Sequence, residues 1–245
     1  MLKQFAGIIL LTVLAACQTV GSAGVDTDNI YPTIEARSDG TTTDVSATFR
    51  QDSLTSLVFI ELTEGDFAEA IMRAPGSTTD EVKAMSHLTI AGLTSYYTSF
   101  TASAEGTKFT VNLDRAGSGK TSAPDSFGTL PLAFSATLTG GPDFQRGVDA
   151  ITIDWAPSGE AEPLTYSAMG DCIDNLSDVP ITGDSGSVTI TSGALVASSG
   201  AEANTCEVTV RIRRVRSGAI DAAYGGGVFR GVQYDEVVFN STPAP

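Results

Sequence analysis

The sequence has few of the residues that catalysis and metal binding use most. It contains one histidine and three cysteines in 245 residues, so a zinc site built from cysteine and histidine side chains lacks ligands. Basic residues are also scarce: 14 Lys and Arg stand against 29 Asp and Glu, which gives a formal net charge of −15. A surface this acidic is repelled by nucleic acid and by anionic lipid headgroups. We therefore expect no nucleic-acid partner and no metal site.

Sequence motifs for cofactor binding and for most hydrolase chemistry are also missing. There is no glycine-rich phosphate loop, no dinucleotide fingerprint, no CxxC pair and no Gly-x-Ser-x-Gly elbow. After Cys17 there is no apolar run of the ~20 residues that a transmembrane helix needs. We therefore expect no cofactor, no catalytic residue and no enzyme activity.

The first 16 residues have the three parts of a secretory signal. Lys3 supplies the positive charge, residues 5–16 are almost wholly apolar, and small residues precede Cys17. Leu14-Ala15-Ala16-Cys17 resembles the lipobox of bacterial lipoproteins. The resemblance implies that residues 1–16 are removed and that Cys17 receives a diacylglycerol. An ordinary signal peptide, cleaved before an unmodified cysteine, is the alternative.

The same resemblance predicts where the protein resides. One acyl chain binds a membrane only marginally, so a stable anchor needs several chains. In lipoproteins an aspartate after the modified cysteine often marks retention in the inner membrane, whereas this chain has Gln18. We therefore expect a cell-envelope protein anchored by Cys17 in the outer membrane, facing the periplasm or the cell surface.

The residues after the lipobox predict a flexible tether. Residues 19–29 are small, polar or acidic and show no apolar periodicity, so we expect a lipidated tether over 17–29. Asp26 and Asp28 alternate as calcium ligands do, but the glycine and the distal glutamate of a calcium loop are missing. A solvated linker is the simpler interpretation.

Alternation of apolar and polar residues predicts an all-β protein. Expected strands lie near 45–50, 57–60, 97–100, 108–113, 132–134, 151–155, 164–168, 188–190, 206–213 and 237–239. Such short strands indicate one or two antiparallel β-sandwich domains, immunoglobulin-like in general architecture. Trp155 precedes both Cys172 and Cys206, whereas the immunoglobulin fold has its tryptophan between the cysteines, so that topology is not predicted.

Three further features divide the chain. Residues 79–93 are the best helix candidate, although Thr89 and Ile90 suit a strand equally well. Residues 116–129 are rich in Gly, Ser and Pro and predict a loop. The break at 139–142 predicts a boundary between an N-terminal β domain over 30–140 and a C-terminal β-sandwich over 141–245.

Cys172 and Cys206 are an even pair in an exported chain, which predicts a disulfide. The chain-entropy model for a loop of about 34 residues gives roughly 3–4 kcal/mol of stabilisation. Cys206 shares strand parity with Val208 and Val210, so its sulfur is expected to point inward. Two free thiols are the alternative.

Gly183-Asp184-Ser185-Gly186 resembles the nucleophile loop of chymotrypsin-like serine proteases. The resemblance implies Ser185 as nucleophile and needs a histidine base. His87 precedes Ser185 in the chain, but its neighbours lack the alanine-alanine-histidine-cysteine context of that family. A tight turn explains the same residues, so a serine hydrolase is kept only as an alternative.

Two charged groups are candidate binding sites. Arg211 and Arg213 lie on the outward face of one predicted strand and form a patch for a carboxylate, a phosphate or an acidic glycan, or pair with acids of the chain itself. Arg214 and Arg216 have the opposite parity unless a bulge intervenes. A second group, near Cys172, could contribute to a calcium site or be ordinary solvated loop. It comprises Asp171, Asp174 and Asp178.

Several segments of the second half resemble the C-terminal part of uncharacterised proteobacterial lipoproteins. They are residues 149–155, 170–172, 184–186, 206–216 and 225–239, about 100 residues with loose spacing. The resemblance implies no known activity. We therefore expect a lipid-anchored cell-envelope protein with a binding or structural role and an envelope protein or glycan as partner. A serine hydrolase using Ser185 and a calcium- or glycan-binding module are the alternatives.

Overall fold

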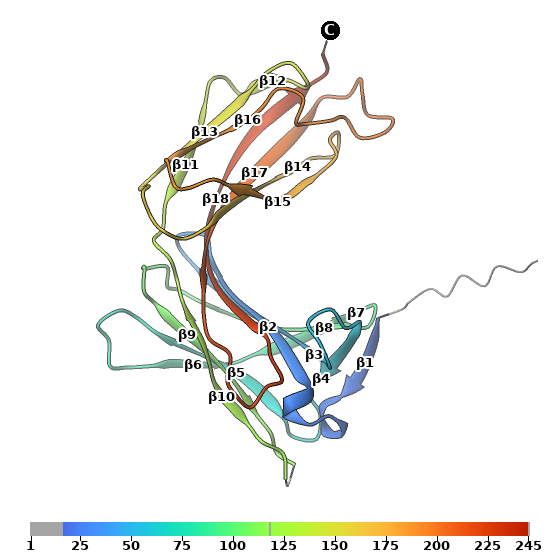
Figure 1. Cartoon of the computed structure of the whole chain (residues 1–245), viewed down its shortest axis with the longest axis vertical. Helices are drawn as coiled ribbons and strands as arrows, with labels where there is room; N and C mark the ends of the chain where they lie inside the picture. The colour runs from blue at the N-terminus through green and yellow to red at the C-terminus, as the bar shows by residue number, and fades with distance from the viewer. Residues whose placement is uncertain (1–16, 118, 245) are drawn as a thin grey trace, which may run out of the picture.

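The computed structural model describes residues 17–117 and 119–244, and Figure 1 shows its course. Nearly all of its regular structure is β-strand, which confirms the predicted all-β fold. The lipobox residues Leu14, Ala15 and Ala16 lie outside the described residues. No helix in the described part is long and apolar enough to cross a membrane.

The strands follow one another with short connections. In the first half they are β1 (Gln18–Gly21), β2 (Ile30–Ser38), β3 (Thr43–Gln51), β4 (Val58–Glu61), β5 (Phe67–Arg73), β6 (Glu81–Ala84), β7 (Ser86–Ile90), β8 (Leu93–Phe100), β9 (Lys108–Asp114) and β10 (Ala123–Thr129). In the second half they are β11 (Ser135–Thr139), β12 (Asp143–Gln145), β13 (Ile151–Ala156), β14 (Leu164–Met169), β15 (Leu176–Ile181), β16 (Ser187–Ile190), β17 (Cys206–Ser217) and β18 (Val228–Thr242). Two 3-10 turns, η1 (Ser22–Gly24) and η2 (Thr27–Asn29), follow β1.

The strands form three sheets. The largest has the order β1-β4-β3-β2-β18-β17-β14-β15, with β7, β8 and β12 attached to it. The others are β10-β9-β5-β6 and β11-β13-β16. Most pairings are antiparallel as expected, but β1 with β4, β12 with β18, and β18 with β2 are parallel.

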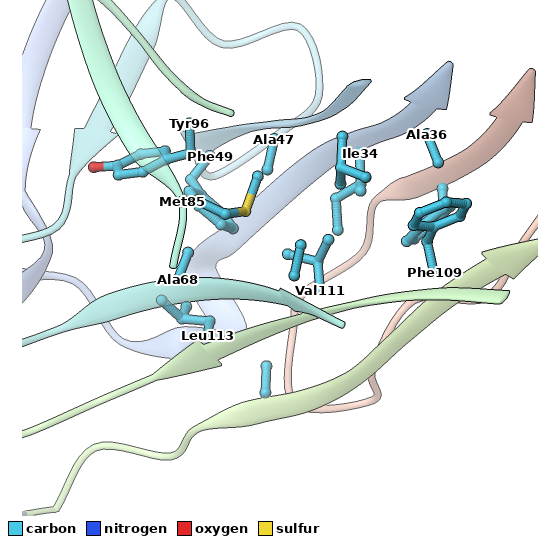
Figure 2. Close-up of a cluster of buried hydrophobic side chains, with 14 of the residues drawn as sticks. Ile34, Ala36, Ala47, Phe49, Ala68, Met85, Tyr96, Phe109, Val111 and Leu113 are labelled. Atoms are coloured by element: carbon cyan, nitrogen blue, oxygen red, sulfur yellow. The ribbon is translucent and has the colours of Figure 1, made fainter. Parts of the chain in front are cut away.

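Each half packs two sheets face to face around its own hydrophobic cluster. In the first half, side chains of β2, β3 and β8 face those of β5 and β9, and Figure 2 shows Phe49, Tyr96 and Phe109 among them. In the second half, Ile153 and Trp155 of β13 belong to a cluster with residues of β14, β17 and β18. The alternation in sequence produces these clusters because every second side chain of a strand points to the same face.

Strands β17 and β18 connect the two halves. They pair without interruption from Cys206↔Ser241 to Ser217↔Arg230, and Figure 1 shows them running through both halves. Phe229 at the start of β18 belongs to the first cluster, whereas Val237 and Phe239 belong to the second. The C-terminal segment therefore completes both cores, which a division at residue 140 did not anticipate.

The helix and loop predictions are wrong, and the strand expected near 132–134 lies just before β11. Residues 79–93 form no helix. They form β6, β7 and the start of β8, because the hairpin pairs Thr89 with Thr94 and Ile90 with Leu93 across a two-residue turn. The predicted loop over 116–129 contains β10, whose Ala123 and Ser126 are buried against neighbouring strands.

The flexible tether is also wrong for the residues after Cys17. Gln18–Gly21 is a strand, and Ser22, Val25 and Thr27 are buried. Small polar residues allowed this because they find buried partners: the Ser22 hydroxyl accepts from the Thr63 amide, and the Ser22 carbonyl accepts from Arg115. Strand β1 therefore starts one residue after Cys17.

Candidate functional site

Cys17 lies at a corner of the large sheet, directly before β1. It is half-buried and is not part of a disulfide. The Gln18 amide donates to the Leu57 carbonyl at 3.0 Å, and the Thr19 hydroxyl donates to the Gly92 carbonyl at 2.8 Å. Gly92 occupies the turn of the β7–β8 hairpin with φ of +81°, and a Cβ there would stand 2.3 Å from the Cys17 carbonyl oxygen. Only glycine allows this close approach, so the hairpin turn packs on the backbone of Cys17.

Arg115 holds the segment that follows β1. Its guanidinium donates to Asp66 at 2.8 Å, to the Ser22 carbonyl at 2.7 Å and to the Val25 carbonyl at 2.9 Å. The side chains of Arg115 and Asp66 are 0% and 3% exposed. Asp66 also accepts from the Ser22 hydroxyl at 2.7 Å. This buried network fixes the corner to the body of the fold.

Arg115→Ala should destabilise the protein by about 3–5 kcal/mol, because it leaves the buried Asp66 carboxylate without its charged partner. Denaturant unfolding measures the loss. Arg73→Ala is the matched control, since Arg73 pairs with Asp80 at 2.6 Å but is half exposed, and exposed pairs contribute about 0–1 kcal/mol. Equal losses in the two variants would contradict the importance of this network.

The four arginines of β17 alternate as predicted and do so without a bulge, since the β17–β18 register is continuous. Arg211 donates to Glu236 at 2.6 Å, and Arg213 donates to Glu35 at 2.8 Å and to Asp178 at 3.0 Å. On the other face Arg214 pairs with Asp184, and Arg216 pairs with Glu162 and Glu105. An anionic ligand at Arg211 and Arg213 would have to displace these carboxylates. The pairing favours the structural interpretation, and the ligand patch stays a prediction.

The Gly183–Ser187 segment forms a turn before β16 that is tied to Arg214. Asp184 accepts from the Trp155 indole at 2.7 Å, from the Glu160 amide at 3.0 Å and from Arg214 at 2.7 Å. The side chains of Arg214 and Asp184 are 0% and 1% exposed. This aspartate orients a buried arginine and an indole rather than a catalytic base.

Ser185 and His87 do not form a catalytic pair in the described structure. The Ser185 hydroxyl donates to the Ser187 carbonyl at 3.1 Å, within its own turn. His87 lies on β7 with Nε2 at 3.6 Å from Glu61. Figure 1 places β7 and β16 in opposite halves of the molecule. The arrangement therefore gives no support to the serine hydrolase alternative.

Acidification should unfold the protein in part through Asp66 and Asp184. Burial raises the pKa of each carboxyl, but the hydrogen bonds and the arginine partner outweigh it, so both pKa values lie below the ordinary 3.8. The folded state thus binds these protons less readily than the unfolded state does. Their contribution is complete above the ordinary pKa and is lost as pH falls through the folded value. Unfolding free energies measured from about pH 6 to about pH 2 should decline below about pH 4, and less so in Asp184→Asn.

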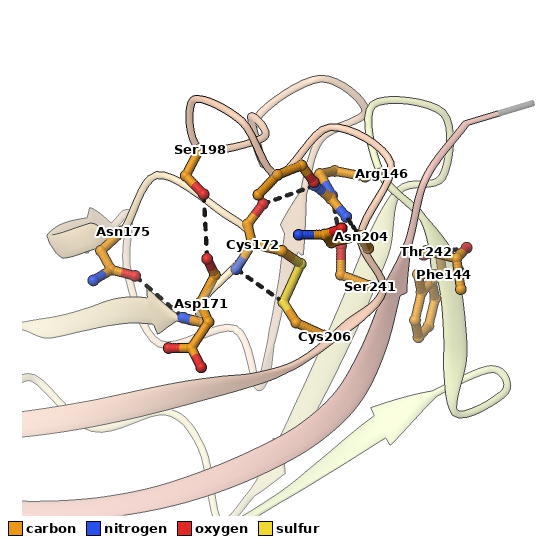
Figure 3. Close-up of a disulfide and its surroundings, with 12 residues drawn as sticks. Phe144, Arg146, Asp171, Cys172, Asn175, Ser198, Asn204, Cys206, Ser241 and Thr242 are labelled. Carbon is orange, nitrogen blue, oxygen red and sulfur yellow. Dashed lines mark hydrogen bonds between the residues drawn. A yellow bond between two sulfur atoms is a disulfide. The ribbon is translucent and has the colours of Figure 1, made fainter.

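Cys172 and Cys206 form the predicted disulfide, which joins the loop after β14 to the start of β17 (Figure 3). Beside it, Arg146 is 7% exposed and donates to the Cys172 carbonyl at 2.7 Å and to the Ser241 hydroxyl at 3.1 Å. Arg146 also donates to the Asn204 carbonyl. The bridge and the arginine together hold three segments at the far end of the second half.

Cys172→Ser with Cys206→Ser should lower the unfolding free energy by about 2–4 kcal/mol, since the bridge no longer restricts the unfolded chain. Denaturant unfolding of the variant and of the oxidised protein measures the difference. A reducing agent added to the unsubstituted chain should lower its unfolding free energy by the same amount. The same agent should leave the unfolding free energy of the variant unchanged. Equal stability of oxidised and reduced protein would contradict the prediction.

The acidic residues near Cys172 do not converge. Across residues 17–117 and 119–244 no group of three or more His, Cys, Asp or Glu side chains could hold a metal ion. Asp178 pairs with Arg213, and Asp26 of the expected linker pairs with Lys120 at 2.7 Å. The structure therefore does not bring Asp171 and Asp174 together with Asp178 as a calcium site.

Sequence reasoning did not find Arg115, Arg146 or Gly92. The partners of Arg115 lie up to 93 positions away, and those of Arg146 up to 95 positions. No local pattern signals such contacts. For Gly92 the only available signal was its place in a hairpin turn, which the helix prediction obscured.

Comparisons with known proteins identify no family for this chain. No family model and no curated protein matches the sequence. Among solved structures, the chain is similar to the FN1–FN3 domains of chicken CNTN1 (8% identity, TM-score 0.30), to the ectodomain of mouse nectin-like molecule 4 (12%, 0.26) and to the Yersinia pseudotuberculosis adhesin InvE (14%, 0.23). These matches cover 89%, 89% and 88% of this chain, which spans 64%, 65% and 61% of those chains. TM-scores this low carry no argument about this protein.

Proposed function

We propose that this is a lipid-anchored protein of the bacterial cell envelope with a binding or structural role. The observation that supports it is the place of Cys17. Strand β1 starts at Gln18, directly after the cysteine that ends the lipobox-like sequence, and Cys17 is in no disulfide. A cleavage directly before Cys17 would leave intact every strand found in residues 17–117 and 119–244.

The chemistry at Cys17 fits a thioether anchor. Its thiol would lose its proton and form a thioether to the diacylglyceryl group of a phospholipid, whose glycerol carbon–oxygen bond breaks to release the phosphate headgroup. The amino group freed by cleavage before Cys17 would accept an acyl chain from the ester of a second phospholipid, which leaves as a lysophospholipid. Several acyl chains make attachment stable, at about 0.8 kcal/mol per buried methylene. Cys172 and Cys206 are already bonded to each other, so neither competes for the lipid.

The binding or structural role concerns the body of the protein. Strands β17 and β18 tie the two halves into one long sheet, and the arginines on its outer face are paired with acids. An envelope protein or a glycan is the partner class that we propose for this surface. The outer membrane is the proposed location.

Metabolic labelling with an alkyne fatty acid tests the anchor. The chain should incorporate the label, and an inhibitor of the lipoprotein signal peptidase should accumulate a form that retains residues 1–16. The variant with Cys172→Ser and Cys206→Ser is the matched control and should keep the label, because only Cys17 is modified. Absence of label in the unsubstituted chain would refute the proposal.

A further inference from the structure

Three segments without charged side chains meet at the Cys17 corner. Residues 17–25, 53–60 and 88–104 contain no Asp, Glu, Lys or Arg, although the chain has 29 acidic residues. The structure joins them through the hydrogen bond from Gln18 to Leu57 and the contact of Gly92 with Cys17. Acidic residues border these segments, since Asp52 precedes residue 53 and Glu61 ends β4 opposite Gly21. The uncharged segments themselves add no repulsion of anionic headgroups.

The same corner exposes large apolar side chains. Ile90 is 63% exposed, Leu88 52%, Leu57 50% and Leu93 41%. Ile90 and Leu93 are directly opposite each other across the hairpin, and Leu88 and Tyr97 share their face. Clustered exposed apolar residues mark a surface that contacts something else. Within the described residues nothing covers this face of the hairpin.

The fold holds Cys17 and the tip of the hairpin at a fixed position relative to each other. Strand β1 begins at Gln18 and pairs with β4, and Arg115 holds the Ser22 and Val25 carbonyls. Ile90 and Leu93 are each within two residues of Gly92, which packs on Cys17. Lipid chains attached to Cys17 would therefore bring the hairpin turn to the membrane surface along with the cysteine.

We propose that the tip of the β7–β8 hairpin, with Ile90 and Leu93, enters the membrane interface beside lipidated Cys17. This inference rests on the proposed lipid anchor and adds a second contact to it. Apolar side chains of this kind partition into the boundary between headgroups and acyl chains. Two contacts fix the orientation of the fold, so that the second half, with its disulfide, points away from the bilayer.

The test uses the purified lipidated protein in vesicles of phosphatidylcholine. Ile90→Cys and Leu93→Cys are labelled with a polarity-sensitive fluorophore, and Val148→Cys is the matched control because Val148 is 51% exposed in the second half. Intact mass confirms the lipid on Cys17, and melting temperatures confirm folding. We expect a blue shift and strong quenching by brominated lipid at Ile90 and Leu93, and neither at Val148.

The other outcomes separate the two proposals. Lipidated protein that floats with the vesicles while the Ile90 and Val148 probes behave alike would overturn the hairpin contact and leave the anchor standing. A blue shift without quenching by brominated lipid would show that a second copy covers the face, which also overturns it. Absence of lipid mass on Cys17 would overturn both.

Discussion

Cys17→Ser should release the protein completely from the membrane when residues 1–16 are replaced by an ordinary secretory signal. The substitution removes the thiol that the proposed lipid would occupy, and a formal charge of −15 opposes binding to anionic lipid. The exposed apolar tip alone is too small to replace several acyl chains. Fractionation after export should find the variant in the soluble fraction and the unsubstituted chain in the membrane.

The released variant should keep its fold. Cys17 contributes no disulfide and no hydrophobic core side chain, so the melting temperature and the Cys172–Cys206 bridge should be unchanged. If the variant stays in the membrane fraction after a high-salt wash, something other than the lipid holds it. That result would contradict the role assigned to Cys17.

Arg214→Ala should lower the unfolding free energy by about 3–5 kcal/mol, because it leaves Asp184 charged and buried without its partner. Arg214 also donates to the Leu132 carbonyl at 2.8 Å and to the Pro157 carbonyl at 3.0 Å, and it stacks over Phe134. One side chain thus joins three segments of the second half. Denaturant unfolding measures the effect.

Arg211→Ala is the matched control on the same strand. Its guanidinium pairs with Glu236, and the two side chains are 28% and 35% exposed. Exposed pairs contribute about 0–1 kcal/mol because water solvates both charges when the pair is broken. Similar losses for the two variants would show that burial does not distinguish them and would contradict the prediction.

The sequence allowed the strands with strong alternation to be predicted. Phe109, Val111 and Leu113 of β9 are fully buried, as their spacing indicated. Strand parity also placed Arg214 on the face opposite Arg211. Asp184, the partner of Arg214, was interpreted only as part of a turn. Parity is a local property of a strand, whereas the partner depends on how distant strands pack.

The failures share one physical cause. The helix over 79–93, the loop over 116–129 and the tether over 17–29 were all judged from local composition. In each case backbone pairing with another strand decided the structure: β1 pairs with the distant β4, whereas β7 and β10 pair with the adjacent strands β8 and β9. Small polar residues fit such positions, and their local propensity did not reveal it.

The connection between the halves could not be predicted for the same reason. Only residues 237–239 stood out as the last strand, whereas β18 extends from Val228 to Thr242. Its first part includes Gly231 and Gln233, which weaken the alternating pattern. Gly231 is required because a Cβ there would stand 2.0 Å from the Thr129 carbonyl oxygen.

The mass of the N-terminal peptide of the mature protein, isolated from membranes, tests the central claim most directly. The account predicts a peptide that begins at Cys17 and carries the added mass of a diacylglyceryl group and a further acyl chain. A peptide that begins at an unmodified Cys17, or that retains residues of 1–16, would contradict it.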